Sequence, residues 1–391
     1  MIQLDRKEDC CGCTACESIC GKNAIVLKPD EEGFLYPQVD VSKCVDCHLC
    51  EVVCPINSRE KGIGKLENQH FYAVRHKDKG ILMNSSSGGA FSAIAQVVLD
   101  HGGIVYGAIY DENMVVRHVA IEKVEDLWKL RGSKYVQSDI RGIFKEIKSS
   151  LSYGKYVLFS GTPCQVDGLK NYLRKNYEHL ITIDLVCHAA GSPLLFNNYI
   201  EYMETKLKGR IRWMNMRDKS KWGWSHRFLQ SVDLESGLKI YNDSNMISWW
   251  SIYYSHFANR PACHECQYTN YCRPGDITLA DFWDDEQNRP ELRSDRGTSL
   301  IIVNSNKGKI ILDSIKDLSL WEVTQKEAWQ PCLEAPTPAN IRRDVFWQVY
   351  LQKGYQYTFR KFFCVSKTTL LKWKTKDFIA KTIGYTPKKA K

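Results

Sequence analysis

The sequence lacks any long hydrophobic run. No stretch of its 391 residues approaches the roughly 18 consecutive apolar residues that a membrane-spanning helix needs. The N-terminus, Met-Ile-Gln-Leu-Asp-Arg-Lys, has no apolar core of the kind found in secretory signals. We therefore expect neither a membrane span nor export. The sixteen cysteines are then expected to serve as ligands in a reducing cytoplasm rather than to form disulfides.

Most of the chain also lacks a net charge. Residues 351–391 hold eleven Lys or Arg and a single acid, Asp377, whereas the whole chain has a net charge of +9. The remainder is therefore close to neutral, and we expect no nucleic-acid partner. The basic tail could lie weakly on an anionic membrane surface or an acidic partner. The alternative is a solvated terminal helix without a partner.

What the sequence does contain is one cysteine pattern, C-x2-C-x2-C-x3-C, in two copies. This is the run of bacterial two-cluster ferredoxins, in which each 4Fe-4S cluster takes three cysteines from one copy and the fourth from the other. The spacing predicts one cluster on Cys10, Cys13, Cys16 and Cys54. It predicts the other on Cys44, Cys47, Cys50 and Cys20.

Structural zinc is the alternative to these clusters. Cysteines two residues apart also bind zinc, but zinc sites usually have two pairs joined by a longer spacer. The strict repeat favours iron–sulfur. Cys11 stands outside the repeat, and we interpret it as a spare thiol packed near a cluster.

The order of predicted elements indicates an α/β protein with a fused ferredoxin unit. After residue 69, apolar runs of strand type at 71–74, 103–110, 115–121, 156–160 and 181–186 alternate with helical patterns at 90–99 and 165–173, as in a sheet covered by helices. Before them, the short apolar runs 24–27 and 34–36 flank a turn and predict a hairpin, and the aromatic stripe at 246–257 is typical of a core helix. The expected organisation is a two-cluster ferredoxin domain, a linker, the two parts of an α/β body and a helical basic tail, at residues 1–58, 59–68, 69–150, 151–325 and 326–391.

Three loops in the body are candidate ligand contacts. The first, from Asn84 to Ala90, precedes an apolar helix, where free N–H groups favour an anion, although it matches neither a P-loop nor a Rossmann fingerprint. The second is the polar loop from Leu130 to Ser138. The third follows a buried strand and contains Cys164, a candidate nucleophile for which no base is visible. Each loop alone is also compatible with an ordinary cap or turn.

A third cysteine group lies further along the chain. Cys263, Cys266 and Cys272 need a fourth ligand, for which Cys187, at the end of an apolar strand, is the candidate. His188 or His264 could take its place. The site could hold a third 4Fe-4S cluster or a structural zinc, and the residues leave this choice open.

Taken in order, these motifs resemble the beta subunits of coenzyme F420 hydrogenases and dehydrogenases over about residues 70–320. The resemblance implies FAD and a nearby cluster that includes Cys187. It also implies that three loops hold the flavin, through Ser86, Ser87, Gly88, Gly89, Arg131, Ser133, Lys134, Tyr135, Gln137, Gly161, Thr162, Pro163, Cys164 and Gln165. Lys134 is expected to be the cation at the flavin. Here the chain reads Cys-His-Ala-Ala-Gly-Ser-Pro from Cys187, where the family commonly has Cys-His-Gly-x-Pro-Ser-Pro.

The prediction is an iron–sulfur flavoprotein oxidoreductase with two N-terminal 4Fe-4S clusters, a third cluster and FAD. It would exchange electrons with a deazaflavin, ferredoxin or nicotinamide carrier, with or without a partner enzyme subunit. Two alternatives remain: an electron relay without its own substrate, and a zinc or iron–sulfur binding protein with a vestigial active site.

Overall fold

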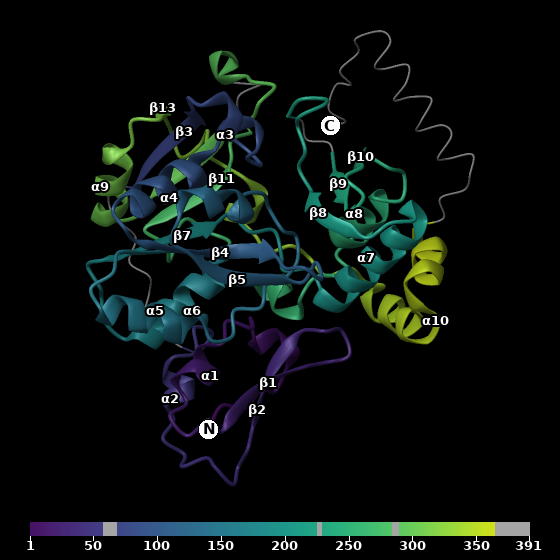
Figure 1. Cartoon of the computed structure of the whole chain (residues 1–391). Coiled ribbons are helices and arrows are strands. Elements are labelled where there is room, and N and C mark those ends of the chain that lie inside the picture. The colour runs from purple at the N-terminus through teal and green to yellow at the C-terminus, as the bar shows by residue number, and fades with distance from the viewer. Residues whose placement is uncertain (58–68, 225–228, 284–288, 364–391) are drawn as a thin grey trace.

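The computed structural model describes residues 1–57, 69–224, 229–283 and 289–363. Figure 1 shows an N-terminal unit at the bottom, a body built on a large sheet at the upper left and a smaller lobe at the upper right. The expected linker at 59–68 and the tail from residue 364 onward lie outside the described residues. No helix in the described ranges is long and apolar enough to cross a membrane.

The N-terminal unit contains the predicted hairpin, in which β1 (Ile25–Pro29) pairs antiparallel with β2 (Leu35–Val39). Its turn is held by Asp30, whose Oδ1 accepts hydrogen bonds from the N–H groups of Glu32 and Phe34 at 3.0 and 2.9 Å. The cysteine runs form little regular structure, namely η1 (Lys7–Asp9), α1 (Ala15–Ile19) and α2 (Leu49–Val52).

An eight-stranded sheet forms the body, in the order β13-β3-β12-β11-β7-β6-β4-β5. Its strands are β3 (His70–His76), β4 (Ile104–Tyr110), β5 (Val116–Ile121), β6 (Val157–Ser160), β7 (Leu180–Leu185), β11 (Ile277–Asp281), β12 (Ser299–Val303) and β13 (Leu318–Val323). The pairs from β11 to β4 are parallel and the outer pairs are antiparallel. The predicted α/β class is confirmed.

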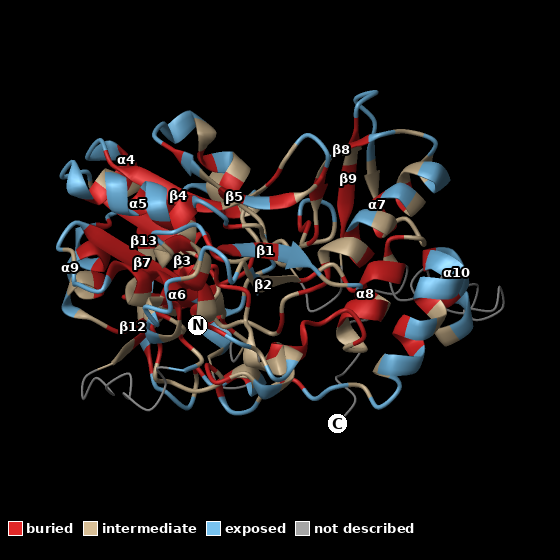
Figure 2. Ribbon diagram, turned by 90° about the horizontal axis from the view of Figure 1, so that it is seen from below, coloured by how far each residue is buried: buried red, intermediate tan, exposed pale blue. Residues whose placement is uncertain are grey.

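Helices cover both faces of this sheet, and Figure 2 shows its strands largely buried. The helices of the body are α3 (Lys79–Met83), α4 (Ala90–Asp100), α5 (Ile143–Ser152), α6 (Pro163–Leu173), α9 (Asn306–Ser314) and the 3-10 helix η3 (Val124–Leu130). Alternate strand residues divide between two cores: Val105 and Leu158 pack with α4 and α9, whereas Tyr106 and Phe159 pack with α5 and α6. The second core also includes Cys13, Ala15 and Val53 of the N-terminal unit.

The smaller lobe combines a three-stranded antiparallel sheet with three helices. These elements are β8 (Ile211–Asn215), β9 (Ser231–Leu234), β10 (Lys239–Tyr241), α7 (Pro193–Leu207), α8 (Ile247–Tyr254) and α10 (Arg343–Phe363), whose course is broken at Gly354. Its core is rich in aromatic rings, among which Trp249 and Trp250 are almost fully buried. The aromatic stripe in the sequence therefore belongs to a core. Short 3-10 turns at Pro261–Glu265 (η4) and Pro331–Leu333 (η7) lie in the connections between the lobe and the body, and a third at Pro290–Leu292 (η6) lies between β11 and β12.

Candidate redox site

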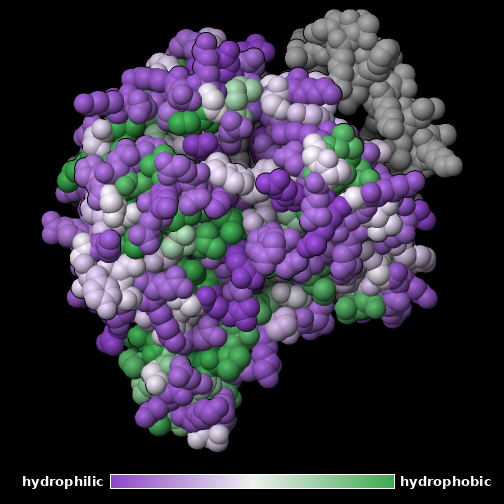
Figure 3. Space-filling model, in the orientation of Figure 1, coloured by the Kyte–Doolittle hydropathy of each residue, from purple (hydrophilic) through white to green (hydrophobic). Residues whose placement is uncertain are grey.

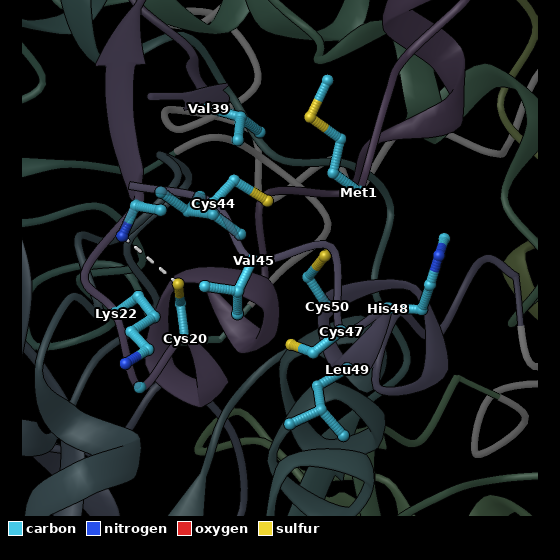
Figure 4. Close-up of a pocket in the computed structure, with 13 residues that line it drawn as sticks. Met1, Cys20, Lys22, Val39, Cys44, Val45, Cys47, His48, Leu49 and Cys50 are labelled. Atoms are coloured by element: carbon cyan, nitrogen blue, oxygen red, sulfur yellow. Dashed lines mark hydrogen bonds between the residues drawn. The ribbon is translucent and has the colours of Figure 1, made fainter. Parts of the chain in front are cut away.

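One cavity of the N-terminal unit is lined by four cysteines, which Figure 4 shows around it: Cys20, Cys44, Cys47 and Cys50. Backbone N–H groups donate to three of the sulfur atoms, from Ile2 to Cys50 at 3.2 Å, from Ala24 to Cys20 at 3.3 Å and from Asp46 to Cys44 at 3.4 Å. Such N–H···S bonds favour a charged thiolate. This is the set that the repeat predicts for one cluster.

The backbone beside this cavity includes two residues in the left-handed conformation. Asp46 and His48 have φ angles of 50° and 59°, and α2 begins directly after His48. Cys50 is buried, whereas Cys47 is exposed, and the nearby Val45 and Val52 are 60% and 54% exposed. Figure 3 shows hydrophobic residues gathered on this unit. The cavity therefore lies near an apolar part of the surface.

The other predicted set is buried between the N-terminal unit and the body. Cys13 and Cys16 are 7% and 9% exposed. Burial raises the pKa of the Cys16 thiol, and the charges of Cys10 and Cys54 raise it further. Cys16 and Cys54 also raise the pKa of Cys13, and Cys10 raises that of Cys54, so the four cysteines lie close enough to influence one another; that they hold one cluster stays a prediction. Between them, Gly12 and Thr14 take left-handed φ angles of 72° and 66°.

A third group of cysteines lies in the body at the ends of two parallel strands. Cys164 stands in the first turn of α6 after β6, and Cys187 follows β7. Burial raises the pKa of Cys187, and the strongest further increases come from Cys263, Cys164 and Cys266. Burial, with Cys266 and Cys164 adding to it, raises the pKa of Cys263 to about 12. Cys164 thus lies close enough to Cys187 and Cys263 to influence the pKa of each.

Two further cysteines stand near this group. Cys332, which sequence reasoning missed, lies in η7, and its Sγ is 3.8 Å from His188 Nδ1. Its charge also raises the pKa of Cys187. Cys272, a predicted ligand, is not among the strongest influences on Cys187 or Cys263, and its backbone N–H donates to Asn270. Within the described ranges, no three His, Cys, Asp or Glu side chains converge as around a single metal ion.

Cys11 lies near members of the first and third groups. Cys13 and Cys164 both influence the pKa of its thiol, and burial contributes to the raised pKa of all three thiols. That Cys11 is a spare thiol beside a cluster stays a prediction. Its proximity to Cys164 was not foreseeable, because the two residues are joined only by the docking of the N-terminal unit on α6.

The Ser/Gly loop, from Asn84 to Ala90, lies against the second candidate loop. Ser86 Oγ accepts a hydrogen bond from the Ser133 N–H at 2.9 Å, and Arg131 Nε donates to Ser92 Oγ at the same distance. Gly88 is required by packing, because a Cβ there would lie 2.3 Å from the carbonyl oxygen of Val74. Gly89, with φ of 86°, begins α4.

The remaining loop residues are divided between two places. Lys134 turns inward, and its Nζ donates to the carbonyl oxygens of Lys129, Leu130 and Arg131 at 2.9 to 3.3 Å. Burial lowers its pKa to about 7. Tyr135 packs edge-on against Trp250. The other predicted residues lie toward the N-terminal unit: Gln137, and the Cys164 loop of Gly161, Thr162, Pro163 and Gln165, where Gln165 Oε1 accepts from the Thr162 N–H.

Two cations beside the Ser/Gly loop were missed because no motif marks them. Lys219 is 2% exposed and its Nζ donates to the Ser87 carbonyl oxygen at 2.6 Å; burial lowers its pKa to about 7. Arg217 forms an ion pair with Asp281 at 3.4 Å and lies over the Trp283 ring. Nη2 is the atom of this ion pair and makes no hydrogen bond to any described residue, whereas Nη1 donates to the Tyr135 hydroxyl at 3.4 Å. These groups offer donors to an anionic or acceptor-rich ligand.

The chain matches two parts of one protein family and a separate cluster domain. Residues 71–145 and 154–328 match the N- and C-terminal parts described as coenzyme F420 hydrogenase/dehydrogenase, beta subunit. Residues 9–58 match a 4Fe-4S dicluster domain.

Curated relatives cover part of the chain. It is 23% identical over 234 residues to an F(420)H(2) dehydrogenase subunit of Methanosarcina mazei, an alignment that spans 56% of this chain and 62% of that protein. It is 26% identical over 206 residues to an uncharacterized protein of Methanocaldococcus jannaschii, spanning 44% of this chain and 54% of that protein. The chain thus spans less than two thirds of both relatives.

A solved structure shows a distant likeness. A chain of the F420-reducing [NiFe] hydrogenase complex from Methanosarcina barkeri aligns with a TM-score of 0.45 and 18% identity, over 75% of this chain and 91% of that chain.

Proposed function

The chain belongs to the coenzyme F420 hydrogenase/dehydrogenase beta-subunit family and carries a 4Fe-4S dicluster domain, and from this premise we propose an iron–sulfur flavoprotein oxidoreductase. Electrons would pass between two N-terminal clusters, a third cluster in the body and FAD. When bound, FAD supplies the step between single electrons and hydride equivalents. The protein contributes the positions and the potentials of these groups.

The donor sets fit three clusters. In the N-terminal unit the proposed ligands are those that the repeat predicts. For the third cluster we propose Cys164 in place of Cys272, giving the set Cys164, Cys187, Cys263 and Cys266, because Cys164 and not Cys272 is among the strongest electrostatic influences on Cys187 and Cys263. The N–H of Ala190 donates to Cys263 Sγ at 3.3 Å, which supports a thiolate there. Cys164 then acts as a ligand and not as a nucleophile.

The observation that carries this proposal is the packing of Cys13, a proposed ligand of the first cluster, against α6, the helix whose first turn contains Cys164. A Cβ at Gly168 of α6 would lie 2.8 Å from Cys13 Sγ. Cys164 lies one turn earlier on this helix, and Cys11 packs against the same core. This packing supports a short connection for electrons between the N-terminal unit and the body.

We assign the flavin to the Ser/Gly loop, where Ser86, Ser87 and Ser133 meet the buried cations Arg217 and Lys219. Arg217 Nη2 is buried, and its described partner is Asp281, in an ion pair at 3.4 Å without a hydrogen bond; this supports a ligand with acceptor oxygens at this place. Lys134 would act on the flavin indirectly, because it holds the backbone of residues 129–131 in place. Lys134→Met should therefore weaken flavin retention, and unchanged flavin content would remove this role.

The carrier is proposed to be of deazaflavin type, since the Methanosarcina mazei relative is named for F(420)H(2). Ferredoxin and nicotinamide are the competing carriers. A partner enzyme subunit could take the place of a soluble carrier, and the exposed apolar surface beside Cys47 is where an electron partner would come closest to a cluster.

Anaerobic purification with iron, zinc and flavin measured beside an absorption spectrum tests the proposal. It requires about twelve iron atoms and one FAD per chain, as for three 4Fe-4S clusters feeding a flavin. About eight iron atoms with zinc and no flavin would make the third site structural. If clusters and flavin are present, stopped-flow reduction with each carrier then separates a deazaflavin enzyme from a relay that turns over none of them.

A further inference from the structure

Arg260 occupies an unusual place for an arginine. It is 0% exposed and directly precedes η4, the turn that contains Cys263. Its side chain extends away from this turn into the N-terminal unit. Its backbone carbonyl oxygen accepts the Cys263 N–H at 2.9 Å. One residue therefore touches two of the proposed cluster sites.

The guanidinium of Arg260 is held on all sides. Nε donates to the carbonyl oxygen of Cys10 at 2.7 Å, and Nη2 donates to Cys10 Sγ at 3.4 Å and to the Leu35 carbonyl oxygen at 2.9 Å. Nη1 donates to Gln137 Oε1 at 2.8 Å. The Tyr36 ring lies 4.4 Å from the guanidinium carbon. These contacts fix the cation against a proposed ligand sulfur.

The positive charge lacks a carboxylate partner. All four hydrogen bonds of the guanidinium end on uncharged oxygen atoms or on Cys10 Sγ, and no ion pair joins Arg260 to an acid in the ranges that the structure describes. A buried, unpaired charge costs several kcal/mol, roughly the desolvation penalty per ion. A 4Fe-4S cluster held by four thiolates carries net negative charge, and this would supply the missing counter-charge.

The other N-terminal site has no such cation among the described residues. The bonds to its sulfur atoms come from backbone N–H groups. Lys22 and His48 line the cavity but are exposed, so solvent screens their charge. The carboxylates of Asp46 and Glu51 stand beside the same segment, paired with the N-terminal ammonium group at 2.8 Å. The two sites therefore differ in electrostatic environment.

We propose that Arg260 raises the reduction potential of the cluster at Cys10 above that of the cluster at Cys44, which rests on the proposed function. Positive charge and hydrogen bonds to ligand sulfur stabilise the reduced, more negative cluster. When the N-terminal unit holds a single electron, that electron then resides on the cluster at Cys10, which lies nearest the body. Transfer of an electron from the cluster at Cys44 to the cluster at Cys10 oxidises the first and reduces the second, without proton uptake.

Redox titration of the full-length protein, followed by EPR, measures the two potentials. The signal that is missing in Cys16→Ala identifies the cluster at Cys10. Arg260→Gln should lower the potential of that cluster and leave the other in place. Arg6→Gln is the matched control, because it removes a cation at the same joint that is 54% exposed and already paired with Asp9 and Glu265.

Equal potentials in Arg260→Gln and the wild type, at full iron content, would overturn the inference. If Arg260→Gln does not retain iron, the potential is measured in Gln137→Glu, which places a carboxylate against Arg260 Nη1 and offsets the positive charge. Gln137→Glu should also lower the potential of the cluster at Cys10, and an unchanged potential would overturn the inference as well. A wild-type protein without iron would instead contradict the proposed function itself.

Discussion

Arg343, at the start of α10, forms a bidentate ion pair with Glu32, which lies 311 positions earlier in the turn of the N-terminal hairpin. The two side chains are 12% and 8% exposed. Arg343 Nη2 also donates to the Asn259 carbonyl oxygen at 2.9 Å, and Ser192 Oγ donates to the Glu32 carbonyl oxygen at 2.5 Å. The hairpin turn is thus tied at one point to three segments of the smaller lobe: the start of α7, the segment after α8 and the start of α10.

Breaking this pair should weaken the whole joint. Glu32→Gln leaves Arg343 buried without its counter-charge, and removal of one partner of a buried pair costs about 3 to 5 kcal/mol. We expect a clearly lower melting temperature by calorimetry. Lys309→Ala is the control: it breaks the pair with Asp313, whose side chains are 37% and 60% exposed, and a helical surface pair contributes only about 0.3 to 0.5 kcal/mol. Similar melting temperatures for both variants would contradict the prediction.

Lys219 should make stability depend on pH. Burial lowers its pKa to about 7 in the folded chain, whereas the pKa of an unfolded lysine stays near its ordinary value of 10.5. Between these values the unfolded state binds a proton that the folded state does not. The unfolding free energy should therefore rise with pH from 7 toward 10, at up to about 1.4 kcal/mol per unit from this group, and fall as pH drops to 7.

Lys219→Met removes that group. Chemical unfolding of wild type and variant from about pH 6.5 to about pH 9.5 should show a smaller slope for the variant. Lys307→Met tests the same effect at a second site: burial also lowers the pKa of Lys307, so this variant should reduce the pH slope of the unfolding free energy as well. Parallel pH curves for wild type and Lys219→Met would mean that Lys219 stays charged in the folded protein.

The ligands of the third site can be separated by two single variants. Cys164→Ala should lose about four iron atoms per chain, the content of one 4Fe-4S cluster. Cys272→Ala should keep them, because Cys164 and not Cys272 is among the strongest electrostatic influences on Cys187 and Cys263. Iron analysis with EPR gives the count. Iron loss only in Cys272→Ala would restore the ligand set that the sequence predicts.

Gly168 should be sensitive to a single methyl group. A Cβ at this position of α6 would lie 2.8 Å from both Cβ and Sγ of Cys13. Gly168→Ala should therefore push the N-terminal unit away from the body, at a cost of about 1 to 3 kcal/mol, and reduce cluster occupancy at Cys13. Gly21→Ala, where nothing lies within 4 Å, should change neither melting temperature nor iron content. A full iron complement in Gly168→Ala would show that α6 can shift freely.

Local patterns in the sequence are enough for much of this architecture. They predict the hairpin, β3 to β7, α4 and α6 close to their observed bounds, since each depends on periodicity and turn residues over a short range. The cysteine repeats predict two sets of thiols that the fold does gather. Spacing carries this information, because three ligands of each set lie within one short loop and the repeat assigns the fourth to the other copy.

The residues that sequence reasoning missed depend on contacts between distant segments. Arg260, Lys219 and Cys332 stand in no motif, and their importance follows only from what they meet in space. Cys164 is conspicuous in the sequence, but as a possible nucleophile, because its neighbours in the chain contain no other cysteine. The sequence presents the Lys134 loop as one ligand-binding unit, whereas its residues face the Ser/Gly loop, a helix end and the N-terminal unit in turn.

The ion pair of Arg343 also has a consequence for the order of synthesis. The ribosome makes the N-terminal unit first, and the partners that enclose Cys10, Cys13 and Glu32 follow only at residues 137, 168, 260 and 343. Until then the cysteines of the first site are open to the machinery that delivers iron and sulfide. Among the described residues, Arg343 is the last of these partners to be synthesised. We therefore expect cluster insertion at Cys13 to have its widest access before α10 is complete.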